Sequence, residues 1–240
     1  MVERGDAEVL RLARSATREG TWVVGLTGAP GAGKSTLAAA LVGFLTAAGE
    51  RVAVLAVDPS SPVSGGALLG DRVRMQARAT DPRVFVRSMA SRGATGGLAP
   101  ATAEAVGVLA AAGWPWVLLE TVGVGQAEVD VAEVADTTVV LVAPAWGDDV
   151  QAEKAGLLEI ADVFVVNKAD QPGAAEARSH LENMLALAPP HDWRPPVVDV
   201  TATTGEGVDE LWSAVVRHRA WCEAGGQRAR TPRARPQTWQ

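Results

Sequence analysis

The segment Gly28-Ala-Pro-Gly-Ala-Gly-Lys-Ser35 has the spacing G-x-x-x-x-G-K-[S/T]. Its glycines let a short loop curl so that backbone N–H groups point at phosphate oxygens, and the helix that follows adds its positive dipole end. Lys34 would reach the β- and γ-phosphates of a nucleoside triphosphate, and Ser35 would offer its hydroxyl to Mg²⁺. The alternative, a glycine-rich turn that binds nothing, is disfavoured by the strand and helix patterns on either side. The nucleotide-binding residues expected here are Gly28, Gly31, Ala32, Gly33, Lys34, Ser35 and Thr36.

A second pattern, Asn167-Lys-Ala-Asp170, follows the apolar stretch Val163–Val166. The carboxylate of Asp170 can accept hydrogen bonds from the ring N–H and the exocyclic amine of guanine, and Lys168 can lie along the plane of the base. Adenine presents an acceptor where guanine presents a donor, so it would leave the carboxylate unpaired. N-K-x-D can arise by chance in a loop, but after the sixth strand of such a chain it indicates a preference for GTP.

The segment Thr201-Ala-Thr-Thr-Gly205 follows the last predicted strand. From there the backbone N–H groups of Thr201, Ala202 and Thr203 would meet O6 of guanine. The alternative is an ordinary β-to-α turn, and only the position relative to Asp170 favours the functional interpretation.

Glu120-Thr-Val-Gly123 ends another apolar stretch, where P-loop proteins keep a carboxylate that orders Mg²⁺ and a glycine whose N–H touches the γ-phosphate. We therefore expect Glu120 in the metal site and Gly123 at the phosphate. The alternative is a solvated carboxylate at the tip of a strand.

These segments need a scaffold, and short Val-, Ile- and Leu-rich runs alternating with Ala-rich amphipathic stretches predict one. The fold class is α/β, a mostly parallel sheet of about seven strands with helices on both faces. Predicted strands are Trp22–Thr27, Val52–Val57, Val84–Arg87, Trp116–Glu120, Thr138–Val142, Val163–Val166 and Val197–Val200. Predicted helices are Lys34–Ala48, Ala101–Ala112, Gln151–Glu159, Ala174–Leu187 and Val208–Trp221.

Length and composition limit the remaining possibilities. With 240 residues, 48% of them hydrophobic, the chain suffices for one sizeable domain, and a net charge of -6 argues against a dedicated nucleic-acid binder. The single cysteine, Cys222, excludes an internal disulfide framework and fits a reducing compartment. No stretch reaches the roughly 20 apolar residues of a membrane span, and Met1–Arg18 does not resemble a secretory signal. We therefore expect a cytoplasmic protein with no membrane and no nucleic acid among its partners.

Further segments give the chain a family resemblance. It resembles the MeaB/ArgK-type GTPases, chaperones of adenosylcobalamin-dependent acyl-CoA mutases, over nearly its whole length. The matching strings, besides those above, are Val57-Asp-Pro-Ser-Ser-Pro, Ser64-Gly-Gly, Leu69-Gly-Asp-Arg-Val-Arg-Met75, Ser88-Met-Ala-Ser-Arg-Gly93, Gly96-Gly-Leu, Glu120-Thr-Val-Gly-Val-Gly-Gln126 and Trp193-Arg-Pro-Pro196. Ala94-Thr95 departs from the larger residues usual in the family.

The resemblance implies that Asp58 and Asp71 join Ser35 and Glu120 around Mg²⁺, in a switch loop that moves with the γ-phosphate. The alternative roles are a turn-forming Asp-Pro pair for Asp58 and a helix N-cap for Asp71.

Gly147-Asp-Asp-Val-Gln-Ala-Glu-Lys154 resembles the additional switch loop of the family. Lys154 would stabilise developing charge in a closed state, and Gln126 would position water, which makes both candidate catalytic residues with Lys34 and Glu120. A surface position is at least as good an account of Lys154 and Gln126.

The expected organisation is a helical extension over 1–20, a GTPase domain over 21–222 and a Pro/Arg-rich tail over 223–240 that resembles the start of the family's dimerisation arm. The resemblance implies an Mg²⁺-dependent GTPase that gates adenosylcobalamin loading or protection of an acyl-CoA mutase, with a homodimer as the family's assembly. Hydrolysis alone is expected to be slow.

Three alternatives remain. A GTPase that inserts nickel would need clustered soft or imidazole ligands, and His180, His191, His218 and Cys222 form no cluster in the sequence. A small-molecule kinase would use ATP, which Asn167-Lys-Ala-Asp170 disfavours. A scaffold that binds GTP without turnover is disfavoured by intact Lys34, Ser35 and Glu120.

Overall fold

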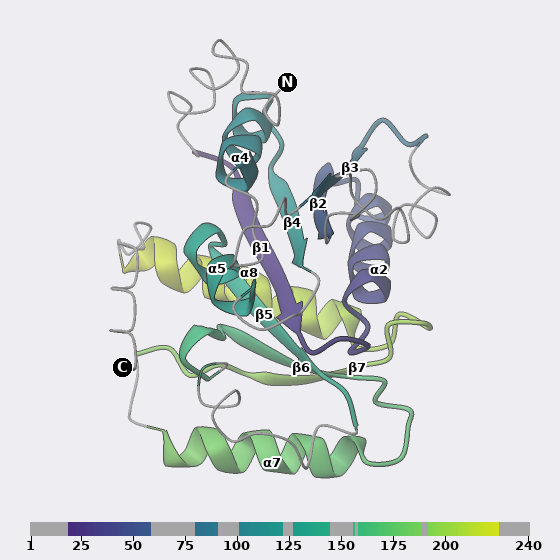
Figure 1. Ribbon diagram of the computed structural model, residues 1–240, viewed down its shortest axis with the longest axis vertical. Helices are drawn as coiled ribbons and strands as arrows, with labels where there is room; N and C mark the ends of the chain where they lie inside the picture. The colour runs from purple at the N-terminus through teal and green to yellow at the C-terminus, as the bar shows by residue number, and fades with distance from the viewer. Residues whose placement is uncertain are drawn as a thin grey trace.

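The protein folds around a seven-stranded sheet in which every pair of neighbouring strands is parallel, in the order β3-β2-β4-β1-β5-β6-β7 (Figure 1). The computed structural model describes residues 19–58, 80–90, 101–121, 127–144, 156, 158–188 and 192–225. The strands are β1 (Trp22–Gly28), β2 (Val52–Asp58), β3 (Val84–Ala90), β4 (Trp116–Thr121), β5 (Thr137–Val142), β6 (Val163–Asn167) and β7 (Val197–Val200). The predicted α/β class and all the predicted strands are confirmed.

Helices cover both faces of the sheet, as its long apolar strands require. They are α2 (Lys34–Ala47), α4 (Ala101–Ala111), α5 (Ala127–Val134), α7 (Ala174–Leu187) and α8 (Val208–Ala224). α2 and α8 share one core with the sheet through Leu37, Leu41 and Leu211, whereas α4 and α5 pack on the other face around Val106 and Val131. None of the described helices combines the length and hydropathy that a membrane crossing requires.

The helix α5 is absent from the helices predicted above. It is only eight residues long and includes the carboxylates Glu128, Asp130 and Glu133. A helix this short is marginal by itself, so it depends on packing. Gly25 of β1 makes that packing possible: a Cβ at this position would lie 2.2 Å from Cγ1 of Val131. The predicted helix Gln151–Glu159 lies mostly outside the described residues, of which 156 and 158–160 are helical.

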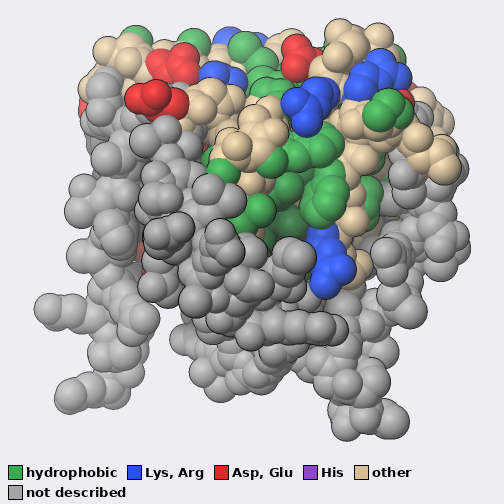
Figure 2. All heavy atoms as spheres, turned by 90° about the horizontal axis from the view of Figure 1, so that it is seen from above, with side chains coloured by type: hydrophobic (Ala, Val, Ile, Leu, Met, Phe, Trp, Pro, Cys, Tyr) green, Lys and Arg blue, Asp and Glu red, His purple; other side chains and the backbone are tan. Residues whose placement is uncertain are grey.

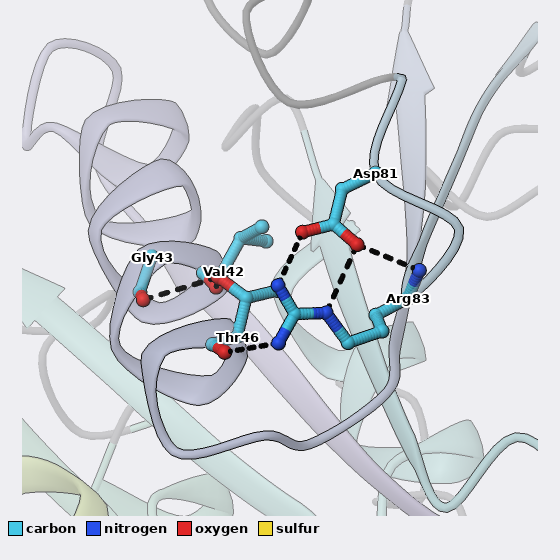
Figure 3. Close-up of polar contacts among 5 residues, drawn as sticks. All are labelled: Val42, Gly43, Thr46, Asp81 and Arg83. Atoms are coloured by element: carbon cyan, nitrogen blue, oxygen red, sulfur yellow. Dashed lines mark hydrogen bonds and ion pairs between the residues drawn. The ribbon is translucent and has the colours of Figure 1, made fainter.

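The turn that leads into β3 is tied to the end of α2 by Arg83 (Figure 3). The guanidinium donates to both carboxylate oxygens of Asp81, at 3.0 and 2.8 Å, and to the carbonyl oxygen of Thr46 at 2.8 Å. Its hydrogen bond to Asp81 and the charge of that carboxylate raise the pKa of Arg83 above its ordinary value. The contact fixes the edge strand β3 against the helix whose first residues are Lys34 and Ser35.

Aromatic side chains gather where the strands begin. Phe85 of β3 is 40% exposed and lies against Trp114, with ring centroids 6.0 Å apart, and the guanidinium of Arg51 lies over the Trp114 ring at 4.5 Å. Figure 2 looks onto the molecule from the end at which β1 begins and shows hydrophobic side chains beside Lys and Arg. This end of the sheet, where the strands begin, is called its amino edge here. It is opposite the carboxyl ends of the strands, where β1 enters the glycine-rich loop.

Candidate functional site

The glycine-rich loop begins where β1 ends, and its backbone requires glycine at particular positions. Gly28, Gly31 and Gly33 have φ of 134°, 77° and 95°, a region that L side chains rarely adopt. A Cβ on Gly28 would lie 2.1 Å from the carbonyl oxygen of Leu141, and one on Gly33 would lie 2.3 Å from Nδ2 of Asn167. Gly31, in contrast, has open space around it. The loop therefore packs tightly at both ends and is open at its middle.

Lys34 and Ser35 are the first residues of α2, so their backbone N–H groups belong to the open first turn of a helix. The Lys34 side chain is 7% exposed, and its Nζ donates to the carbonyl oxygens of Gly28 and Ala29 at 2.7 and 3.0 Å. The ammonium therefore lies directly over the loop. A phosphate held by the loop would meet a positive charge already in place.

Ser35 and Glu120, which the sequence predicts as metal ligands, contact each other in the structure. The Ser35 hydroxyl donates to Oε1 of Glu120, which is 4% exposed and stands near the end of β4. Strand register brings them together, because β4 lies beside β1 and pairs Glu120 with Leu26, shortly before the loop. A hydroxyl and a carboxylate oxygen are hard ligands of the kind Mg²⁺ prefers, so this pair fits the ion.

Asn167 joins two loops. Its Nδ2 donates to the carbonyl oxygen of Ala32 at 2.8 Å, and its Oδ1 accepts from the N–H of Ala202 at 3.2 Å. The residue is 2% exposed. Asn167 is the first residue of the pattern predicted to bind the guanine nucleotide. In the structure its amide connects the glycine-rich loop to the loop after β7.

Lys168, Ala169 and Asp170 form a turn at the carboxyl end of β6. Lys168 has φ of 60°, a conformation uncommon for a residue other than glycine, and its carbonyl oxygen accepts from the N–H of Gln171 at 2.9 Å. The N–H of Ala169 donates to Val200 of β7 at 3.1 Å. This turn leaves the side chain of Asp170 exposed beside the loop after β7.

The loop after β7 is closed on itself. The N–H of Thr201 donates to Glu206 at 3.0 Å and the N–H of Ala202 is taken by Asn167, while Thr203 is exposed. Gly207 ends the loop, where a Cβ would lie 2.1 Å from the carbonyl oxygen of Asp199. Asp199 in turn pairs with Arg178 of α7 at 3.0 Å.

Several predicted site residues are not placed by the structure. Asp58 ends β2, but its side chain lies outside the described set. Asp71, Gly123, Gln126, Gln151 and Lys154 also lie outside the described residues. Their proposed roles remain predictions.

His218 and Cys222, which formed no cluster in the sequence, do meet in the structure. Nε2 of His218 lies 3.6 Å from Sγ of Cys222 and 3.4 Å from Oδ1 of Asp162, and Nδ1 lies 2.8 Å from the Thr137 hydroxyl. This buried network is at the amino edge of the sheet, away from the glycine-rich loop. Among the described residues, no group of three His, Cys, Asp or Glu is arranged to hold a metal ion.

A parallel sheet whose first strand turns through a glycine-rich loop into a helix bearing Lys34 and Ser35 defines a P-loop nucleotide-binding protein. Residues 3–240 match the family described as methylmalonyl Co-A mutase-associated GTPase MeaB. The chain therefore belongs to the MeaB family of GTPases, as its resemblance implied.

Individual relatives agree with this assignment. A GTPase-class protein of Pyrococcus abyssi is 52% identical over 212 residues, covering 86% of this chain and 65% of the relative. GTPase ArgK of Escherichia coli is 42% identical over 85% of this chain and 63% of its own length, and the mouse methylmalonic aciduria type A homolog is 39% identical over 91% and 54%. The chain thus spans less than two-thirds of the length of these three relatives.

Solved structures give the same fold. A structure named LAO/AO transport system kinase superposes with a TM-score of 0.73 at 31% identity, covering 94% of this chain and 68% of the other. HypB of Helicobacter pylori in complex with nickel gives a TM-score of 0.61 at 17% identity over 90% of this chain and 96% of HypB, which establishes a shared fold only.

Proposed function

We propose that the chain hydrolyses GTP to GDP and phosphate with Mg²⁺ and, through its nucleotide state, gates the loading or protection of adenosylcobalamin in an acyl-CoA mutase of the methylmalonyl-CoA type. The single observation that carries the nucleotide assignment is the double hydrogen bond of Asn167, which ties the loop at the phosphate end to the loop at the base end. A nucleotide lying across these loops would contact both at once.

The base would be read by the turn after β6. Asp170 is exposed at the carboxyl edge of the sheet, where its carboxylate can accept the two donors of guanine, and Lys168 precedes it in the same turn. In the loop after β7, hydrogen bonds to Glu206 and Asn167 already engage the N–H groups of Thr201 and Ala202. We therefore assign contact with O6 to the N–H of Thr203.

The phosphates would lie on the open middle of the glycine-rich loop, with Lys34 over them. Ser35 and Glu120 would hold Mg²⁺, joined by Asp58 and Asp71. When bound, Mg²⁺ would neutralise charge on the phosphate oxygens. Because the Ser35 hydroxyl donates its hydrogen to Glu120, its oxygen lone pairs would remain available to the ion.

The family match and one relative support a mutase of this type as the partner. The family description associates its members with methylmalonyl Co-A mutase, and the mouse relative is named for methylmalonic aciduria. We place the GTPase domain at 21–222, flanked by the extension 1–20 and the tail 223–240, and the protein in the cytoplasm. A homodimer through that tail is part of the same proposal.

A kinase is the second candidate, because the solved structure at 31% identity is named a transport system kinase. The nickel-insertion GTPase has only the fold likeness to HypB in its favour.

The test is steady-state hydrolysis of GTP with Mg²⁺, with and without a purified methylmalonyl-CoA mutase, and with ATP as the control nucleotide. GTP-specific turnover that the mutase accelerates is the expected result. Equal slow turnover with any added protein would remove the mutase assignment, and a preference for ATP would favour the kinase. Lys34→Ala serves as the inactive control, since it removes the ammonium over the loop.

A further inference from the structure

A row of short and polar side chains crosses the sheet beside the Ser35–Glu120 pair. Strand register places Ser88 of β3 beside Ala56 of β2, and Ala56 beside Glu120 of β4. All three lie on the face that α2 covers, because they alternate with residues of the opposite core, such as Met89, Val57 and Leu119. Ser88 therefore stands in the row that ends at the proposed metal ligand.

The hydroxyl of Ser88 is buried without a hydrogen-bond partner. A buried hydroxyl of this kind costs free energy unless water or a ligand satisfies it. Ser88 as a whole is half-buried on the edge strand β3, and its neighbour Ala56 on β2 is 2% exposed. The hydroxyl is thus a buried polar atom without a hydrogen-bond partner, on the face of the sheet that α2 covers and in register with Glu120 through Ala56.

The space between Ser88 and Glu120 suits an indirect contact. Neighbouring strands lie about 4.8 Å apart, so the two residues are about 10 Å apart across β2, and the intervening side chain is only the methyl group of Ala56. That separation is too wide for a direct hydrogen bond. Mg²⁺ sheds its hydration reluctantly and usually keeps several waters, which are strong hydrogen-bond donors.

We propose that Ser88 is a positioning residue of the magnesium site, its hydroxyl accepting a hydrogen bond from a water that Mg²⁺ retains. The proposal rests on the proposed function, since it needs Mg²⁺ between Ser35 and Glu120. Ser88 touches neither phosphate nor base; it orients the hydration shell, in the way that outer groups orient metal ligands.

The experiment measures the Mg²⁺ dependence of nucleotide binding rather than turnover. A fluorescent GDP analogue is titrated into the full chain over a range of Mg²⁺ concentrations. Ser88→Ala is expected to raise the Mg²⁺ concentration for half-maximal binding about tenfold, in the range found when outer contacts of metal sites are removed. GDP affinity without Mg²⁺ should stay as in the unmodified chain.

Two further variants separate this role from a structural one. Ser88→Thr keeps the hydroxyl and should restore the Mg²⁺ dependence, even if Ser88→Ala folds poorly. Thr138→Val removes another buried hydroxyl without a hydrogen-bond partner, at the amino edge of β5, and should leave the Mg²⁺ dependence unchanged.

Equal Mg²⁺ dependence of Ser88→Ala and the unmodified chain would overturn the proposal, as would a shift of the same size in Thr138→Val. Failure of the proposed function has a different signature, because the unmodified chain would then bind no guanine nucleotide at any Mg²⁺ concentration.

Discussion

The side-chain amide of Asn167 donates to the backbone carbonyl of Ala32 at 2.8 Å, although the two residues are 135 positions apart in the chain. The Oδ1 atom of the same amide accepts a hydrogen bond from the N–H of Ala202. One buried amide therefore links the glycine-rich loop to the loop after β7.

Replacing Asn167 with alanine should weaken both stability and nucleotide binding. The change leaves the carbonyl of Ala32 and the N–H of Ala202 without this partner, at a cost of about 1–3 kcal/mol. Thermal unfolding and titration with a fluorescent GDP analogue would measure the two effects. Gln171→Ala, at an exposed position in the neighbouring turn, is the control and should change neither.

Gly33→Ala and Gly31→Ala form a matched pair. Both add a methyl group at positive φ, which costs about 1–2 kcal/mol. Only the methyl on Gly33 would also collide, 2.3 Å from Nδ2 of Asn167. We expect Gly33→Ala to lower the melting temperature clearly more than Gly31→Ala. Equal melting temperatures would show that the loop relaxes around the added methyl group.

Asp170→Asn should reduce the preference for GTP over xanthosine triphosphate. The substitution turns part of a double acceptor into a donor, and an unsatisfied contact of this kind costs about 1–3 kcal/mol. Competition of the two nucleotides for the same fluorescent analogue would measure the change. Asp209→Asn, an exposed carboxylate in the first turn of α8, is the control. Unchanged preference in Asp170→Asn would refute the role of Asp170 in reading the base.

His218→Leu should destabilise the fold without altering nucleotide affinity. The imidazole is 2% exposed and contacts the hydroxyl of Thr137 and the carboxylate of Asp162, so its removal should cost about 1–3 kcal/mol. Because this network lies where the strands begin, the glycine-rich loop at their other end should be unaffected. Denaturant unfolding measures the change in stability, and titration with GDP measures the nucleotide affinity. His180→Leu, on the exposed side of α7, is the control. A large loss of GDP affinity would contradict the independence of the His218 network from the glycine-rich loop.

The sequence by itself determined the class of fold and the ends of the strands that carry chemistry. Apolar runs of strand length alternating with amphipathic stretches allow few arrangements other than a parallel sheet covered on both faces, and every predicted strand is present. The sequence also predicted the glycine-rich loop. Positive φ and close contacts at Gly28 and Gly33 exclude residues with a side chain, so glycine is required there.

Only the tertiary structure decided how these segments meet. Strand order places β4 beside β1 and brings Glu120 to Ser35, and the same order sets Ser88 two strands away from Glu120. The linking role of Asn167 and the network around His218 depend on contacts between distant segments. The helix α5 was missed for the same reason: a helix of eight residues is marginal by itself and depends on its packing against Gly25. Local propensity and periodicity report the state of a segment, whereas its neighbours are selected by packing of the whole chain.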